Sequence, residues 1–183
     1  MFDAVGLVAA PDRRSSHLPE AVATIITGQM LSNAAAAAIV KRLFQAGVEC
    51  GAGELFDIPE NKLLGCGLSR RKVRSIKEFG EVFRHSPEKF DEWPSLSYED
   101  LRAEVRQHWG LSDWTAEMLA IFHFGNGDVF PSADGTIKRA VGLIHNHLDP
   151  DFDPDLARPH RTTLARVLWA SIDCGYWKAQ EIA

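Results

Sequence analysis

Asp134 is the main candidate for a reactive carboxylate in this sequence. It follows a loop that contains glycine and proline, and it directly precedes a predicted helix with an apolar face. A short side chain at that position accepts hydrogen bonds from the first backbone N–H groups of the helix. Asp134 therefore has either a structural role, as a helix cap, or a chemical one, as a carboxylate that the turn aims outward. The local pattern leaves both open.

A second helix start lies shortly before it, at Ser112, after the turn that Gly110 and Leu111 form. Two helices joined by a tight glycine-containing hairpin leave backbone N–H groups at a helix N-terminus, and such groups bind a phosphate regardless of base sequence. An ordinary connection between two packed helices fits the spacing equally well. The hairpin is thus a candidate phosphate anchor.

A run of basic side chains offers a second candidate for phosphate contact. Five cations and no acid fall within eight residues: Arg70, Arg71, Lys72, Arg74 and Lys77. Most such runs are solvated helix faces, and the net charge of −5 argues mildly against a general nucleic-acid binder. A local phosphate-contacting patch is the alternative.

Two tryptophans are further candidates: Trp114 lies at the start of a helix near the turn, and Trp169 lies late in the last helix. Buried aromatic side chains are most often plain core. An aromatic wall beside a carboxylate is nevertheless what a site for a flat, cationic ring requires. Both residues are therefore candidates for a ligand pocket.

Metal and cofactor sites are not expected. The three cysteines are far apart and form no C-x-x-C pair, which argues against zinc or an iron–sulfur cluster. The aspartate-rich stretch 149–155 departs from a calcium loop, since Pro154 replaces the turn glycine and His160 the bidentate glutamate. We expect this stretch, and the loop through residue 159, to be solvated.

Length and composition fit one domain of a soluble globular protein: 183 residues, 45% hydrophobic and 25% charged. No apolar run suits a bilayer span, and the N-terminus lacks the positive charges of a secretory signal. We expect a cytoplasmic protein without membrane contact, associated with the nucleoid if the source is bacterial.

Helical spacing recurs along the chain, whereas strict strand alternation does not. The sequence predicts an all-α fold of about nine or ten helices. The clearest are expected at residues 20–30, 34–44, 69–83, 97–109, 112–124, 134–147 and 162–173. Gly47, Gly51 and Gly53 are expected to break the second of these, and a further short helix is expected to be interrupted near Pro59.

Taken together, these segments resemble the helix-hairpin-helix (HhH-GPD) DNA glycosylase superfamily, and within it the alkyladenine, 3-methyladenine DNA glycosylase II-like branch. The resemblance follows the chain in order. It rests on ITGQMLS at 26–32, GCGLSRRK at 65–72, WTAEML at 114–119, DVFP at 128–131 with Asp134, and the closing helix 161–169.

The resemblance implies a single domain over residues 1–183 with two helical lobes and the active site in the cleft between them. One lobe would span roughly residues 20–134, and the N-terminal residues together with 135–183 would form the other. It implies hydrolysis of the N-glycosidic bond of alkylated purines in duplex DNA, in base excision repair. The partner would be damaged double-stranded DNA, bound by a monomer without a cofactor.

Roles carry over position by position. Asp134 falls on the catalytic aspartate, Trp114 and Trp169 on pocket tryptophans, and Gln29 and Met30 on the wedge that fills the gap left by a flipped base. The phosphate anchor would comprise the hairpin and part of the basic helix, namely Gly110, Leu111, Ser112, Thr115, Arg70, Arg71 and Lys72. In relatives the hairpin often holds a monovalent cation on backbone carbonyls.

One position indicates the type of glycosylase. Trp114 stands where bifunctional relatives carry a lysine, so the resemblance implies a monofunctional enzyme that leaves an abasic site. The chain departs from the family pattern at Ser112, where a glycine is usual, and at Ala133 and Gly135 beside Asp134. The alternatives are the same fold acting on uracil or an oxidised purine, a non-catalytic module that binds damaged DNA, and a helical protein-interaction domain.

Overall fold

The computed structural model describes residues 17–179, and within that range it contains helices and turns but no strand. The all-α prediction is therefore confirmed. The chain divides into two compact units between Phe124 and Gly125, ten residues before the boundary suggested by the sequence. We call the described residues 17–124 the hairpin unit and residues 125–179 the Asp134 unit. The N-terminal residues assigned to the second lobe lie outside the described range.

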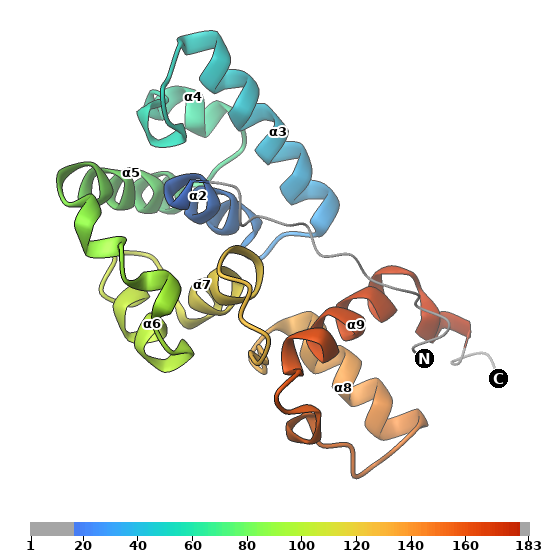
Figure 1. Ribbon diagram of the computed structural model, residues 1–183. Coiled ribbons are helices and arrows are strands. Elements are labelled where there is room, and N and C mark those ends of the chain that lie inside the picture. The colour runs from blue at the N-terminus through green and yellow to red at the C-terminus, as the bar shows by residue number, and fades with distance from the viewer. Residues whose placement is uncertain (1–16, 180–183) are drawn as a thin grey trace. The chain divides into compact units, whose positions relative to one another are not determined.

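The hairpin unit is built on α2 (Leu18–Gly28), which packs against α3 (Asn33–Cys50), α5 (Arg70–His85) and α7 (Asp113–Met118), as Figure 1 shows. Val22 and Ile26 of α2 have no exposed surface, as expected of the central helix of a core. Two shorter α-helices, α4 (Glu60–Gly65) and α6 (Tyr98–Val105), belong to the same unit. Single 3₁₀ turns lie at Leu55–Asp57, Pro87–Phe90 and Trp93–Ser95.

Helix α3 runs past the first of its predicted glycine breaks, and α2 ends two residues earlier than predicted. Helix α3 continues through Gly47, one of the three glycines predicted to break it, where a Cβ would lie at an ordinary contact distance of 3.5 Å from Ile58. The helix ends at the second of these glycines, Gly51, whose φ of +63° suits a glycine cap. Helix α2 ends at Gly28, so Gln29 and Met30 lie in a turn rather than in the predicted helix.

A π-helical turn, Leu119–His123, follows α7 and ends the hairpin unit. The predicted helix 112–124 is therefore real but irregular in its second half. The helix predicted over residues 97–109 ends earlier than expected, at Val105, and turns connect it to Gly110.

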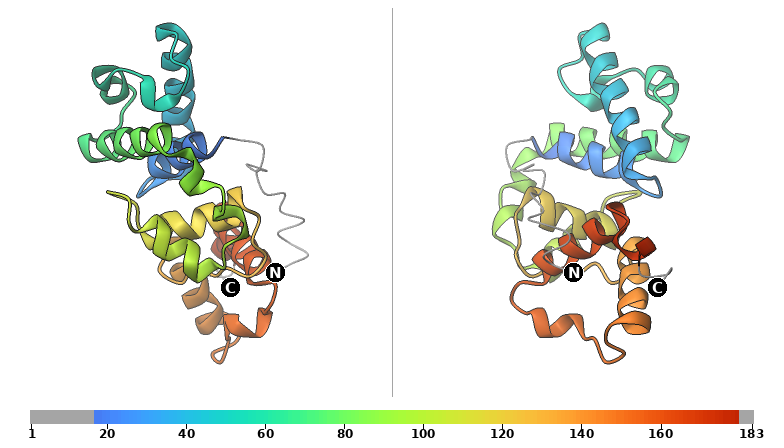
Figure 2. Two further views of the ribbon diagram at one scale, coloured as in Figure 1. Left: turned by 60° about the vertical axis from the view of Figure 1, so that its left-hand side comes forward. Right: turned by 90° about the vertical axis from the view of Figure 1, so that its right-hand side faces the viewer.

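The Asp134 unit consists of α8 (Gly135–His147) and α9 (Arg161–Asp173), which lie side by side in Figures 1 and 2. Its core contains Ile137, Ala140, Ile144, Leu164, Ala165, Leu168 and Trp177. The loop predicted at residues 149–159 contains one 3₁₀ turn, Pro154–Ala157, and a second such turn, Tyr176–Ala179, follows α9. Each helix buries apolar side chains of the other, and this packing positions Asp134 at the start of α8 and Arg161 at the start of α9.

Candidate active site and DNA-contacting elements

Asp134 is the N-cap of α8, as the sequence suggested. Its Oδ1 accepts hydrogen bonds from the backbone N–H groups of Thr136 at 2.9 Å and Ile137 at 3.0 Å. A third donor comes from the other helix of the unit, because the indole N–H of Trp169 lies 3.0 Å from the same oxygen. Three donors on one oxygen fix the rotation of the carboxylate, and the positive end of the helix dipole favours its charge.

The loop that leads to Asp134 is held by an ion pair. Arg161, the first residue of α9, donates from Nε to Asp128 Oδ1 at 2.7 Å and from an Nη to Oδ2 at 3.0 Å. The adjacent Thr162 donates to the carbonyl of Asn126 and accepts from the N–H of Val129. The Arg161 guanidinium lowers the pKa of the Asp128 carboxyl. Helix α9 thus secures both the loop and, through Trp169, the carboxylate that follows it.

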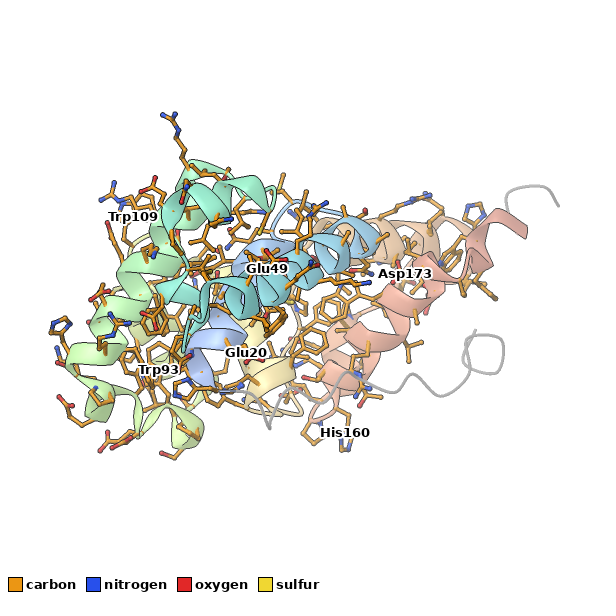
Figure 3. The ribbon with its side chains drawn as sticks, turned by 90° about the horizontal axis from the view of Figure 1, so that it is seen from above. Glu20, Glu49, Trp93, Trp109, His160 and Asp173 are labelled. Atoms are coloured by element: carbon orange, nitrogen blue, oxygen red, sulfur yellow. The ribbon has the colours of Figure 1, made fainter. Side chains whose placement is uncertain are left out.

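Sequence reasoning did not assign Asp128 a role of its own. One signal was present: a cation in the first turn of a helix is unfavourable beside the positive end of the helix dipole, and therefore requires an acidic partner. Arg161 is such a cation, and its side chain is only 16% exposed. Figure 3 shows α9 with His160 and Asp173 labelled at its two ends.

In the hairpin unit, Gly110 makes the turn with a φ of +78°. A side chain at this position would meet Ser75 Oγ of α5 at 2.0 Å, so the absence of a Cβ seats the turn against the basic helix. Ser112 then begins α7 with a capping box: its Oγ accepts from the Thr115 N–H, and Thr115 Oγ1 accepts from the Ser112 N–H.

The backbone N–H groups of the predicted phosphate anchor have acceptors within the hairpin itself. The N–H groups of Leu111, Ser112 and Thr115 donate within the turn, the first to the carbonyl of His108. Leu111 and Thr115 are also buried, so their side chains belong to the core. The capping box and the turn thus give these three N–H groups acceptors within the hairpin, and the phosphate contact of this segment stays a prediction.

The predicted wedge residues differ sharply in environment. Met30 is fully exposed, and its φ of +58° makes it the non-glycine residue with positive φ among those that the structure describes. Such a conformation costs about 1–3 kcal/mol and persists only where its surroundings enforce it. Gln29, by contrast, is half-buried, and its Nε2 donates to Thr115 Oγ1 at 3.1 Å. The Met30 side chain thus lies in solvent, whereas the Gln29 side chain bonds the turn that holds both residues to α7.

The basic helix α5 begins at its Ser69 cap, and its arginines point outward. Arg70 and Arg71 are exposed, and the Arg74 guanidinium stacks 3.9 Å from the centre of the Trp109 ring. Trp109, labelled in Figure 3, directly precedes Gly110 of the hairpin. Lys72 is the exception. Its ammonium turns inward and donates to the carbonyls of Thr27 at 2.9 Å and Gln29 at 2.7 Å, contrary to the predicted phosphate contact.

The two candidate pocket tryptophans are both half-buried. Trp114 lies in α7 of the hairpin unit, and Trp169 lies in α9 of the Asp134 unit. Trp169 packs against the core of its own unit while its indole N–H binds Asp134. Sequence reasoning placed it beside the carboxylate but did not foresee this direct bond.

Residues 17–179 contain no cluster of three or more histidine, cysteine or acidic side chains suited to a metal ion. Over the same range, no helix combines the length and hydropathy of a membrane span.

Comparison with known proteins gives consistent matches. An alkylbase DNA glycosidase-like protein of fission yeast (Schizosaccharomyces pombe) is 28% identical over 84% of this chain and 78% of its own length. DNA-3-methyladenine glycosylase 1 of the same organism is 31% identical over 63% of this chain. The chain spans about half, 54%, of the second relative.

Solved structures show the same similarity. The 3-methyladenine DNA glycosylase of S. pombe in complex with abasic DNA matches with a TM-score of 0.79 and 25% identity, over 93% of this chain and 88% of that one. A DNA-3-methyladenine glycosidase from Bacillus halodurans matches in fold with a TM-score of 0.69 and 24% identity, over 92% and 81%. The family model of the HhH-GPD superfamily base excision DNA repair proteins covers residues 22–156. With its capped hairpin and its aspartate at the start of α8, this chain belongs to the HhH-GPD superfamily of base excision DNA repair proteins.

Proposed function

We propose that this protein is a monofunctional DNA glycosylase that removes alkylated purines of the 3-methyladenine and 7-methylguanine type from duplex DNA. The observation that carries the proposal is the fixed Asp134 carboxylate, with three N–H donors on Oδ1 at the start of α8. The two yeast relatives, named for alkylated-base and 3-methyladenine chemistry, support the choice of lesion.

The proposed chemistry needs little beyond a well-placed anion. A purine alkylated at N3 or N7 is cationic, so when its C1′–N bond breaks, the bonding electrons leave with a neutral base. Positive charge then develops on the sugar as an oxocarbenium ion, which the Asp134 carboxylate stabilises. Water adds to C1′ and loses a proton to the carboxylate and then to solvent, which leaves an abasic site.

The hairpin unit supplies DNA contacts in this proposal. A base must leave the stack before its glycosidic bond is accessible, and a damaged base costs less to extrude. Met30, exposed and unbranched, fills the vacated space. Arg70 and Arg71 contact phosphates. Trp114 occupies the position at which bifunctional relatives carry a lysine, so no strand cleavage follows base removal.

The test is base release from methylated duplex DNA, measured by chromatography, with the DNA strand analysed before and after alkali. The proposal predicts free 3-methyladenine or 7-methylguanine and strand breaks only after alkali. Breaks before alkali would contradict the monofunctional assignment. Release of uracil or an oxidised purine alone would contradict the lesion class. Binding to damaged DNA without release of any base would instead identify a damage-binding module.

A further inference from the structure

Lys72 differs from its neighbours on α5 in the direction of its side chain. Arg70 and Arg71 are exposed to solvent, whereas the Lys72 ammonium is half-buried and reaches the C-terminal end of α2. There it donates to the carbonyls of Thr27, which has no exposed surface, and Gln29. Burial lowers the pKa of the Lys72 ammonium.

Lys72 places a positive charge at the C-terminal end of α2. The last carbonyls of a helix lack intrahelical partners and carry the negative end of the dipole, so a cation there is stabilising. Helix α2 has no basic residue in its own last turn. Lys72 supplies that charge from another helix, and one of its acceptors, the Gln29 carbonyl, directly precedes Met30.

A second hydrogen bond, from Gln29 to α7, holds the turn that contains Gln29 and Met30. The Gln29 side chain donates to Thr115 Oγ1 at 3.1 Å, and that oxygen also accepts from the N–H of Ser112 in the hairpin. A continuous set of hydrogen bonds therefore runs from Lys72 on α5 through Gln29 to Thr115 in α7. All of these residues belong to the hairpin unit.

We infer that Lys72 is a positioning residue of the wedge, which together with the Gln29–Thr115 bond holds the turn that presents Met30 in its left-handed conformation. The inference rests on the proposed wedge role of Met30. It also assigns Lys72 a different function from that of its neighbours: in the proposed function Arg70 and Arg71 contact phosphates, whereas Lys72 fixes the geometry of the side chain that enters the duplex.

Salt dependence of binding separates these two functions. Each lost phosphate contact reduces the slope of log Kd against log salt by about 0.9, whereas a lost positioning contact weakens binding with the slope unchanged. The experiment measures binding of the full chain to abasic-site duplex DNA for wild type, Lys72→Met, Lys72→Arg and Arg71→Met. The two methionine variants remove the same charge from adjacent positions of one helix.

We expect Lys72→Met to weaken binding by about tenfold, since hydrogen bonds from a charged donor are the strong ones, and to leave the salt slope unchanged. Lys72→Arg, which keeps the charge and donors, should restore most of the affinity. Arg71→Met should flatten the slope. A slope for Lys72→Met as flat as that for Arg71→Met would overturn the inference.

A second background distinguishes positioning of the wedge from a general structural role. In Met30→Gly protein the wedge side chain is absent, so adding Lys72→Met should change the affinity by less than about twofold. An undiminished tenfold loss in that background would also overturn the inference. If Lys72→Met does not fold, Thr115→Val serves in its place, because it removes the hydrogen bond from Gln29 to Thr115. Its loss of affinity for abasic-site DNA should likewise be smaller in Met30→Gly protein than in wild type.

These outcomes remain distinct from failure of the proposed function. Wild-type protein that binds abasic DNA but releases no base would contradict the glycosylase proposal and still allow every comparison above. Wild-type protein that releases base, with Lys72→Met behaving as a lost phosphate contact, would contradict only the positioning role.

Discussion

The indole N–H of Trp169 lies 3.0 Å from Oδ1 of Asp134, so the last long helix of the chain donates directly to the carboxylate that caps α8. The bond joins two residues 35 positions apart through the side-by-side packing of α8 and α9. It gives Trp169 an orienting role in addition to the pocket role that the sequence suggested, and the two roles make different predictions.

Trp169→Phe keeps an aromatic ring and removes the N–H donor. If the N–H orients Asp134, the single-turnover rate of base release should fall by roughly tenfold, about the worth of one hydrogen bond to a charged group, while affinity for damaged DNA changes little. If stacking were the main role, phenylalanine would largely preserve the rate. Trp177→Phe is the matched control, since its indole N–H binds Ser171 in the same unit and should leave the rate unchanged.

Met30→Gly should separate stability from function. Glycine adopts a positive φ without steric cost, and Met30 is fully exposed with φ +58°, so the free energy of unfolding should stay the same or rise by up to about 1 kcal/mol. Binding to abasic-site DNA should weaken, because the wedge is lost. Urea unfolding and a binding titration measure the two effects. Unchanged binding would remove Met30 from the DNA contact.

Gly110→Ala should disturb the hairpin. The new Cβ would lie 2.0 Å from Ser75 Oγ, and the φ of +78° is unfavourable for alanine, so we expect a loss of about 1–3 kcal/mol in unfolding free energy and weaker DNA binding. Adding Ser75→Ala removes the Oγ contact but not the backbone strain. The double variant should therefore recover only part of the stability, and full recovery would show that the backbone conformation costs nothing.

Asp128→Asn should reveal the ion pair with Arg161 through its pH dependence. The folded-state pKa of Asp128 is lowered from the usual 3.8, so the pair stabilises the protein above about pH 4 and loses that contribution as the pH falls through the lowered pKa. At pH 7 we expect the variant to be less stable by about 1 kcal/mol, a value that allows for partial exposure of the pair. The difference in unfolding free energy from wild type should shrink towards pH 2. Arg161→Met should show the same trend, and a difference independent of pH would contradict the assignment.

The sequence predicted the helices and the cap at Asp134 because those features depend on local patterns: helical spacing, Ser and Asp at helix starts, and glycine at turns. It did not predict the inward turn of Lys72 or the Asp128–Arg161 pair, because each joins segments 33 to 45 residues apart that only folding brings together. The resemblance to a family placed Gln29 in the wedge, whereas its bond to Thr115 depends on how α2 and α7 pack. Helix caps and turns could thus be predicted from the sequence, whereas hydrogen bonds between distant segments could not.

The most direct test of the catalytic assignment is the single-turnover rate of 7-methylguanine release from methylated duplex DNA by Asp134→Asn. Asparagine caps a helix about as well as aspartate and keeps an acceptor for Trp169, so the fold and DNA binding should persist while the charge is lost. Asp153→Asn, which changes the exposed cap of the Pro154–Ala157 turn, is the matched control. We predict a loss of at least about 10²-fold for Asp134→Asn, the scale of removing one electrostatic contact to the transition state, and no loss for Asp153→Asn. Asp134→Asn protein that binds damaged DNA normally and releases 7-methylguanine at the wild-type rate would contradict the account.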